Sequence, residues 1–270
     1  MEATQPLKHQ TEQGVQPQTC AWILHGLNTH PKKMSALRDY LSKHSSSASI
    51  GVLSGHHPEA AAHEKITAAN WKSEFSSQWK DAVSQCNHSS DRRIFAGYSL
   101  GALVALSLLD GASDIPAPTH MVLIAPALKL RKKVNLVKAL SWLPFGALPS
   151  LNHEEYRARS WTTLSAYDAL FDLNKNWQQN SWKFSKKIPT VMFLARQDEL
   201  VDSQTIAHDV ENFSHWKTVW ISNEKSRLKP AYHHLMLDEA SVGKDSWTRI
   251  QQEIDLLLNT KSEIWNSSGD

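Results

Sequence analysis

The sequence predicts an α/β fold: a doubly wound, mainly parallel sheet of about six strands, with an inserted helical lid. Two observations support this prediction. Short, almost wholly apolar runs, typical of strands buried on both faces, alternate with longer segments whose apolar residues recur at helical spacing. Such alternation is typical of parallel strands joined by right-handed helical crossovers. One stretch, residues 127–187, breaks the alternation and is too long for a simple crossover.

The predicted strands are short apolar runs that end in turn-forming residues. They cover residues 19–24, 49–53, 93–96, 119–125, 189–195 and 216–221. Helical periodicity is found between them, at residues 31–46, 59–87, 102–109, 163–173 and 246–258. In the second of these segments Trp71, Phe75, Trp79 and Val83 recur every four residues, which predicts a stripe packed on the sheet.

These elements divide the chain into three parts. Residues 1–18 are polar and predict a flexible arm. Residues 19–126 and 188–270 form the predicted α/β core. We interpret residues 127–187 as a helical lid above the strand ends, where a lid would exclude water and shape a pocket.

Composition excludes several classes of protein. A formal net charge of +2 gives no argument for a nucleic-acid partner, because phosphate binding needs a concentrated basic face. Cys20 and Cys86 are too few for a disulfide framework, and we expect two independent buried thiols in a reducing compartment. No apolar run approaches the roughly 20 residues that span a bilayer, and residues 1–18 lack the apolar core of a signal peptide. These observations together predict a cytoplasmic protein.

The most informative motif is Gly97-Tyr98-Ser99-Leu100-Gly101. It follows the predicted strand 93–96 and precedes the apolar helix 102–109. A serine at such a strand–turn–helix junction is held out of the sheet, where its hydroxyl can attack a substrate. The turn is tight enough that side chains at Gly97 and Gly101 would collide with neighbouring elements. Ser99 is therefore the candidate nucleophile.

A nucleophilic serine needs a base and an acid that orients the base. In a sheet of this kind the acid comes from a loop after a later strand. Asp198 directly follows the strand 189–195, at the same edge of the sheet as Ser99. We predict that Asp198 is the acid, with Asp202 as the alternative.

The base is expected after the last strand and before the last helix. His233 and His234 both lie there, between the strand 216–221 and the helix 246–258. The position favours a catalytic histidine but does not separate the two neighbours. We favour His233 and keep His234 as the alternative.

The oxyanion of the reaction needs N–H donors. Gly26 follows the first strand and allows the backbone to turn, so that the Leu27 N–H can point at a substrate carbonyl. The Leu100 N–H, directly after the nucleophile, supplies the second donor. We expect His25 to brace this loop through hydrogen bonds.

Other site types are less well supported. His56, His57, His63 and Glu64 are close in sequence, but their spacing matches no established metal site, and we predict none. No phosphate-binding glycine loop or dinucleotide fingerprint is present. Within the predicted lid, Trp142, Leu143 and Phe145 form an apolar patch that could bury an acyl chain.

Taken in order, these motifs resemble the α/β-hydrolase superfamily over roughly residues 19–260. Within it the chain is most similar to the lidded carboxylesterase, monoacylglycerol lipase and lysophospholipase group. The resemblance rests on His25-Gly26, Gly55-His56, the Ser99 motif, Asp198-Glu199-Leu200-Val201, and the spacing from His233 to Asp238, which His234 and Glu239 match equally. It implies Ser99 as nucleophile, Asp198 as acid and His233 as base, with no cofactor.

The function expected from the sequence is hydrolysis of carboxylic esters, of medium or long acyl chains, through an acyl-enzyme on Ser99. The expected partner is a small ester or lipid, with transient contact to a membrane or micelle surface allowed. A thioesterase, an amidase or an acyltransferase would use the same residues. A third hypothesis, a non-catalytic binding module on the same scaffold, is disfavoured because every catalytic position is filled.

Overall fold

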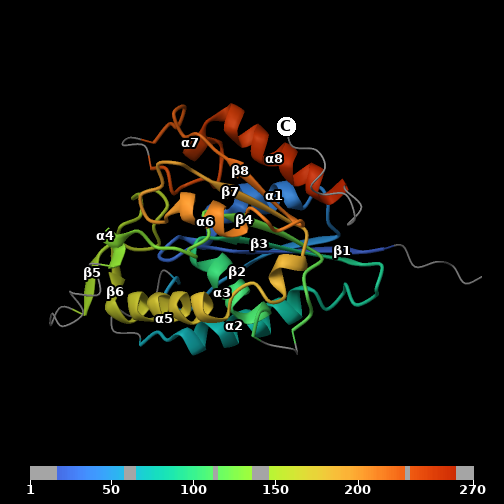
Figure 1. Cartoon of the computed structure of the whole chain (residues 1–270), viewed down its shortest axis with the longest axis horizontal. Helices are drawn as coiled ribbons and strands as arrows, with labels where there is room; N and C mark the ends of the chain where they lie inside the picture. The colour runs from blue at the N-terminus through green and yellow to red at the C-terminus, as the bar shows by residue number, and fades with distance from the viewer. Residues whose placement is uncertain (1–16, 58–64, 112–114, 136–145, 229–231, 260–270) are drawn as a thin grey trace, which may run out of the picture.

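The computed structural model describes residues 17–57, 65–111, 115–135, 146–228 and 232–259. Its centre is a sheet of six parallel strands in the order β2-β1-β3-β4-β7-β8, with helices on both faces (Figure 1). The strands are β1 (Thr19–Leu24), β2 (Ser47–Gly51), β3 (Arg92–Tyr98), β4 (His120–Ile124), β7 (Thr190–Leu194) and β8 (Trp216–Trp220). The predicted fold class and all six predicted strands are confirmed, with shifts of one or two residues at most ends.

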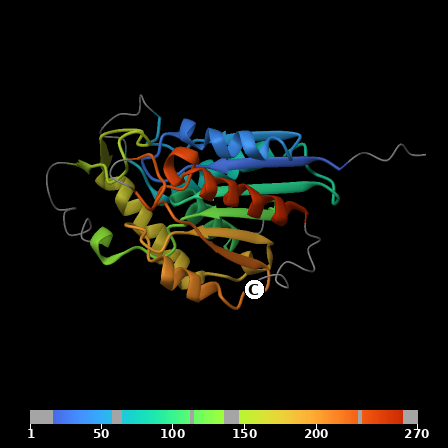
Figure 2. The ribbon, with the colours of Figure 1, turned by 90° about the horizontal axis from the view of Figure 1, so that it is seen from above.

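Along the central strands, alternating side chains pack into two separate cores. Trp22 of β1 belongs to the core under α2 (Ala68–Ala82), α3 (Leu100–Leu109) and α6 (Ser203–Val210). The next residue, Ile23, belongs to the core under α1 (Ser35–Leu41) and α8 (Lys244–Asn259). Figure 1 shows α1 and α8 above the strands and α2 below them, and Figure 2 shows α8 lying across the sheet. This burial on both faces explains why the strands are apolar without alternation.

Two predicted helices are shorter in the structure. The segment 31–46 contains a 3₁₀ turn, η1 (Pro31–Met34), and α1, and then ends in serine-rich turns. In the segment 59–87, residues 58–64 lie outside the described ranges and α2 begins only at Ala68. Thr67 starts it, because its hydroxyl accepts the Asn70 N–H while the Asn70 side chain accepts the Thr67 N–H. Within the described ranges, no helix has the length and apolar character needed to cross a bilayer.

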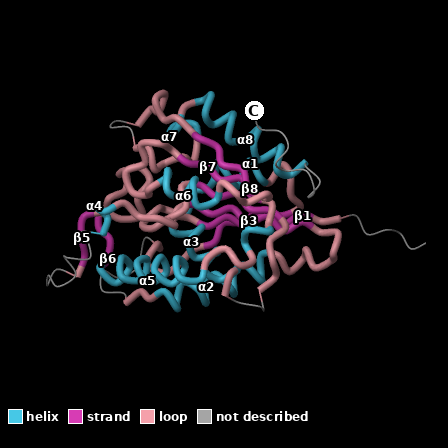
Figure 3. Tube along the Cα trace, viewed as in Figure 1, coloured by secondary structure: helices cyan, strands magenta, loops and turns pink. Residues whose placement is uncertain are grey.

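Between β4 and β7 the chain leaves the sheet. This excursion holds the short helix α4 (Lys132–Asn135), the strand pair β5 (Ala147–Pro149) and β6 (Trp161–Thr163), the long helix α5 (Leu164–Asn180) and a 3₁₀ turn, η3 (Ser185–Lys187). β5 and β6 pair antiparallel and lie apart from the main sheet (Figure 3). Helix α5 packs on α3 and α2. After β8 a long loop leads to α7 (Glu239–Val242) and α8.

The two cysteines form a disulfide, so the prediction of two independent thiols is wrong. Cys20 and Cys86 are joined, with their Cα atoms 6.1 Å apart and both side chains buried. They are 66 residues apart in sequence. Cys20 lies at the start of β1 and Cys86 shortly before β3, and these strands are neighbours in the sheet. Strand pairing therefore brings the cysteines together, and only the sheet order reveals it.

Candidate active site

Ser99 lies at the turn between β3 and α3 in a strained conformation. Its φ is 49° and ψ is −110°, a left-handed conformation that non-glycine residues rarely adopt. Its backbone is held on both sides, because Ser99 N–H donates to Ile124 O and the Ser99 carbonyl accepts the Ala127 N–H. Ser99 is 8% exposed and lies at the N-terminus of α3.

The two glycines of the motif are required by close backbone approach. A Cβ on Gly97 would lie 2.8 Å from the backbone of Ala102, and one on Gly101 would lie 2.6 Å from the carbonyl oxygen of Leu24. Both contacts are with backbone, which cannot move aside as a flexible side chain can. The turn that exposes Ser99 therefore depends on these glycines.

His234 joins Ser99 to Asp198. Its Nε2 lies 2.9 Å from Ser99 Oγ, and its Nδ1 lies 2.8 Å from Asp198 Oδ2. A protonated Nδ1 that donates to Asp198 leaves Nε2 free to accept the serine proton. Asp198 is buried and keeps its orientation because Oδ1 accepts the N–H groups of Leu200 and Val201, each at 2.8 Å.

The histidine that contacts Ser99 is thus His234, and the prediction of His233 is corrected. Consecutive side chains on this loop point to different places: His234 is 2% exposed, whereas His233 lines a separate cavity beside Arg196 and Trp220. Glu199 holds the loop in this register. Its two carboxylate oxygens accept the N–H groups of His233, at 2.9 Å, and His234, at 3.0 Å.

The alternative acid, Asp202, has a different position. It caps α6, with Oδ1 accepting the Thr205 N–H and Oδ2 accepting the Thr205 hydroxyl. Asp198 and not Asp202 contacts the histidine. The sequence associates Glu199 only with the Asp198 motif and predicts no contact for it, because hydrogen bonds from a side chain to the backbone of a distant loop leave no sequence pattern.

The loop after β1 positions the Leu27 N–H. Gly26 O accepts the Thr29 N–H at 3.1 Å and lies 2.9 Å from His25 Nδ1, which donates to it. His25 Nε2 accepts the Leu53 N–H at 3.2 Å, so the tautomer is assigned by its partners. In a trans peptide the N–H points opposite to the C=O. The Leu27 N–H therefore points away from the groups that bind Gly26 O, and Leu27 lines the pocket together with Ser99.

The neutral state of His25 follows from its surroundings. Complete burial, together with the neighbouring His56 ring 4.4 Å away between centroids, holds the pKa of His25 well below its usual value. Burial likewise lowers the pKa of His56 to about 4. The expectation that His25 braces this loop agrees with these contacts.

Leu100, the first residue of α3, has no acceptor for its N–H within the helix.

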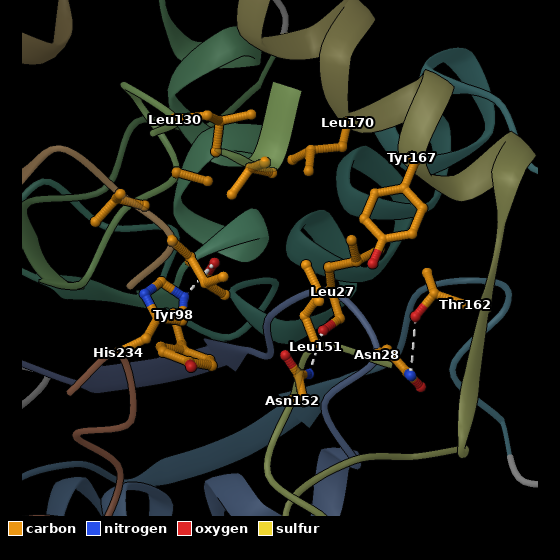
Figure 4. A pocket seen from close by; sticks show the side chains of 15 residues that line it. Leu27, Asn28, Tyr98, Leu130, Leu151, Asn152, Thr162, Tyr167, Leu170 and His234 are labelled. Atoms are coloured by element: carbon orange, nitrogen blue, oxygen red, sulfur yellow. Dashed lines mark hydrogen bonds between the residues drawn. The ribbon is translucent and has the colours of Figure 1, made fainter. Parts of the chain in front are cut away.

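A small cavity opens beside Ser99 and His234 (Figure 4). Its volume is about 40 Å³. Most of its walls are apolar, and many come from the excursion between β4 and β7, with Tyr167 and Leu170 of α5 pointing into it. The predicted pocket residues Trp142, Leu143 and Phe145 lie outside the described residues. Asn28 and Asn152, which the sequence did not single out, supply polar groups to the wall.

The histidine-rich segment has no metal-binding geometry in the described part of the chain. His63 and Glu64 lie outside the described ranges. No group of three or more His, Cys, Asp or Glu side chains among the described residues is arranged to hold a metal ion. Instead, His56 Nδ1 donates to Ser54 O at 3.0 Å, beside the His25 ring.

The chain is similar to known proteins at the level of structure. No protein-family model matches the chain, and no curated protein sequence matches it. A structure from work on LipS and LipT, two metagenome-derived lipolytic enzymes, superposes with a TM-score of 0.69 at 17% identity, covering 90% of this chain and 95% of that one. A soluble variant of monoglyceride lipase from Saccharomyces cerevisiae superposes with a TM-score of 0.66 at 14% identity, covering 92% of this chain and 89% of that one.

A third similar structure is MenH from S. aureus, with a TM-score of 0.53 at 15% identity, covering 91% of this chain and 95% of that one. Identities this low carry the architecture but not a substrate. The mainly parallel sheet of six strands, flanked by helices, agrees with the architecture of these structures. The chain therefore has the α/β-hydrolase fold that these lipases and MenH share.

Proposed function

We propose that this protein is a serine hydrolase that cleaves carboxylic esters through an acyl-enzyme on Ser99. The observation that carries the proposal is the His234 bridge, with Nε2 2.9 Å from Ser99 Oγ and Nδ1 2.8 Å from Asp198. These distances are within the range in which a base can take a proton from its nucleophile. The lipase and esterase neighbours are consistent with ester chemistry on this fold.

The first half of the reaction acylates the enzyme. Ser99 Oγ attacks the ester carbonyl carbon while His234 Nε2 accepts the hydroxyl proton. The negative charge that forms on the carbonyl oxygen is stabilised by the N–H groups of Leu27 and Leu100. Asp198 remains ionised and stabilises the imidazolium. As the C–O bond to the alcohol breaks, His234 gives its proton to the departing oxygen.

The second half releases the acid. A water molecule attacks the acyl carbon, and His234 accepts one of its protons. The bond between the acyl carbon and Ser99 Oγ then breaks, and the proton returns to the serine. The N–H groups of Leu27 and Leu100 bind the oxyanion in this half also, and each such donor typically increases the rate by about 10² to 10³. The steps described require the side chains named here and water.

A fluorophosphonate probe tests the proposal directly. We expect the wild-type protein to be labelled on Ser99, identified by mass spectrometry of the labelled peptide, and Ser99→Ala to remain unlabelled. Parallel assays with an ester, a thioester and an anilide of the same short acyl group then separate esterase from thioesterase and amidase activity. Wild-type protein that does not react would contradict catalysis and favour a binding module.

The acyl group is the second part of the proposal. The sequence favoured medium or long chains on the basis of Trp142, Leu143 and Phe145. The cavity at Ser99 has a volume of about 40 Å³, which is small for a ligand pocket. Because the cavity is small and its walls are mostly apolar, we propose a short, unbranched acyl chain in place of a medium or long one. p-Nitrophenyl esters of increasing chain length test this, and kcat/KM that rises beyond C8 would contradict it.

A further inference from the structure

Asn28 occupies an unusual position next to the proposed oxyanion donor Leu27. It is 5% exposed and has a φ of 49°. Its side-chain nitrogen lies 2.8 Å from Ser150 Oγ, 2.9 Å from Arg159 O, 3.1 Å from Trp161 O and 3.0 Å from Thr162 Oγ1, and Oδ1 accepts the Arg159 N–H at 3.0 Å. All these partners lie in one segment, residues 150–162, which runs from the end of β5 into β6 and which we call the strap.

The strap is also bound to the backbone of the loop that carries Leu27. Asn152 Nδ2 donates to Leu27 O at 2.6 Å, and the Ala158 N–H donates to Asn28 O at 2.8 Å. Further along, the His30 N–H donates to the strap at Tyr156 O, at 2.8 Å. Figure 4 shows Asn152 beside Leu27 and the hydrogen bond from Asn28 to Thr162. The loop is therefore held by the strap along residues 27–30.

The same strap reaches the loop that carries His234. The Tyr156 hydroxyl donates to the carboxylate of Asp238 at 2.7 Å, and the Tyr232 hydroxyl donates to Leu151 O. One segment thus contacts both loops that supply the proposed oxyanion donor and base.

We infer that Asn28 is a positioning residue of the oxyanion hole and that the strap is a fixed component of the active site; this inference rests on the proposed function. A non-glycine residue with a φ of 49° is strained, and asparagine tolerates this conformation better than most residues. The bonds to the strap stabilise it. Because Asn28 follows Leu27, its contacts hold the peptide between the two residues, whose carbonyl also accepts a hydrogen bond from Asn152. Release of this peptide would let Leu27 rotate and would change the direction of its N–H.

Two variants separate the contributions of conformation and contact. Asn28→Gly keeps the left-handed backbone accessible and removes every side-chain bond to the strap. Thr162→Val removes one acceptor and leaves residue 28 intact. The control is Asn212→Gly, in an exposed turn between α6 and β8. The readouts are kcat, KM, and the inhibition constant of a short trifluoromethyl ketone, which forms an oxyanion on adding to Ser99.

For Asn28→Gly we expect kcat to fall at least tenfold and KM to stay within threefold. The ketone should bind more weakly by the factor lost in kcat/KM, since both depend on the same donor. Thr162→Val should show a smaller loss of the same pattern, and Asn212→Gly none. If Asn28→Gly lowers the melting temperature but keeps kcat and ketone affinity within twofold, the residue is only structural and the inference is overturned.

A wrong proposed function would give a different result from a wrong role for Asn28. In that case wild-type Ser99 would not react with a fluorophosphonate, whatever residue 28 is. Amide hydrogen exchange still tests the strap in a protein without activity: the Arg159 amide, which donates to Asn28 Oδ1, should exchange at least tenfold faster in Asn28→Gly. Unchanged exchange at Arg159 would show that the side chain does not hold the strap.

Discussion

At the scale of single residues, the choice between two adjacent histidines decides the chemistry of this site. His233 and His234 are one peptide apart, and both follow the last strand of the sheet. Glu199 binds both of their backbone N–H groups and leaves the side chains to diverge. Asn223, 1% exposed, supports the same loop by donating to Leu235 O at 2.7 Å. His234 alone is therefore directed at Ser99.

Substitution of these histidines gives the first prediction. His234→Ala should lower kcat on a short p-nitrophenyl ester by on the order of 10⁴ to 10⁶, because the base is lost. His233→Ala is the matched control and should stay within about fivefold of wild type, since it contacts neither Ser99 nor Asp198. An inactive His233→Ala together with an active His234→Ala would assign the base to the other residue.

At the scale of elements, α5 connects the excursion to the proposed acyl site. The sequence predicted a helix over 163–173, and the observed helix, capped by Thr163, continues to Asn180. Leu170 lines the cavity, while Leu173, nearly one turn further on, is fully buried and does not line it. The two leucines therefore share a helix and a degree of burial but differ in whether they face the cavity.

This difference gives the second prediction. Leu170→Ala should enlarge the cavity and shift the preferred p-nitrophenyl ester to a chain two or more carbons longer. Leu173→Ala should destabilise the protein to a similar degree, by about 2 to 5 kcal/mol for either leucine, without changing the preferred chain. Chain-length profiles and denaturant unfolding of both variants measure the two effects. The same profile in both variants would show that α5 does not limit the acyl group.

At the scale of the whole molecule, the disulfide changes the expected surroundings of the protein. The cytoplasmic prediction rested partly on two free thiols, and the structure pairs them. Stable disulfides are typical of oxidising compartments and rare in the cytoplasm. The pairing thus favours an oxidising environment. The disulfide lies where β1 begins, whereas Ser99 follows the end of β3. Loss of the disulfide should therefore change stability without changing catalysis.

The third prediction follows from this separation. Replacing both cysteines by alanine should lower the free energy of unfolding by about 4 kcal/mol, the loop-closure contribution of a 66-residue separation. The value of kcat should remain within about twofold. Reduction with dithiothreitol should destabilise wild type but not the double variant. Two alkylatable thiols in unreduced, unfolded wild-type protein would contradict the bond.

The fourth prediction concerns pH. Burial lowers the pKa of His56 to about 4 from an ordinary value of 6.5. As pH falls, residue 56 is therefore protonated in the unfolded chain before it is protonated in the folded protein. The free energy of unfolding is highest above pH 6.5 and decreases as pH falls toward 4. The loss approaches about 3 kcal/mol, from a difference of about 2.5 pH units. Denaturant unfolding at pH 7.5 and 4.5 measures it.

A glutamine at position 56 cannot titrate, so His56→Gln should show a smaller loss of stability between the two pH values. The control, His57→Gln, changes an exposed neighbour and should keep the wild-type loss. If His56→Gln and wild type lose the same stability, the pH dependence arises elsewhere. The buried His25, whose pKa burial also lowers, would then be the next residue to replace.

The sequence by itself determined the architecture and most of the candidate site. Apolar runs specify buried strands, because a strand covered on both faces has no solvent side. The Ser99 turn can be predicted because its glycines are required by close contacts within the turn. Asp198 can be predicted because it follows a strand at the same edge of the parallel sheet. Each of these signals is local in the chain.

The tertiary structure alone decided which histidine meets Ser99, that Cys20 and Cys86 pair, and that Asn28 binds the strap. In each case the deciding contact joins residues far apart in the chain, 66 residues for the cysteines. Such contacts depend on strand order and on the direction of individual side chains. A single sequence records neither, because periodicity and motif spacing describe neighbours in the chain and not neighbours in space.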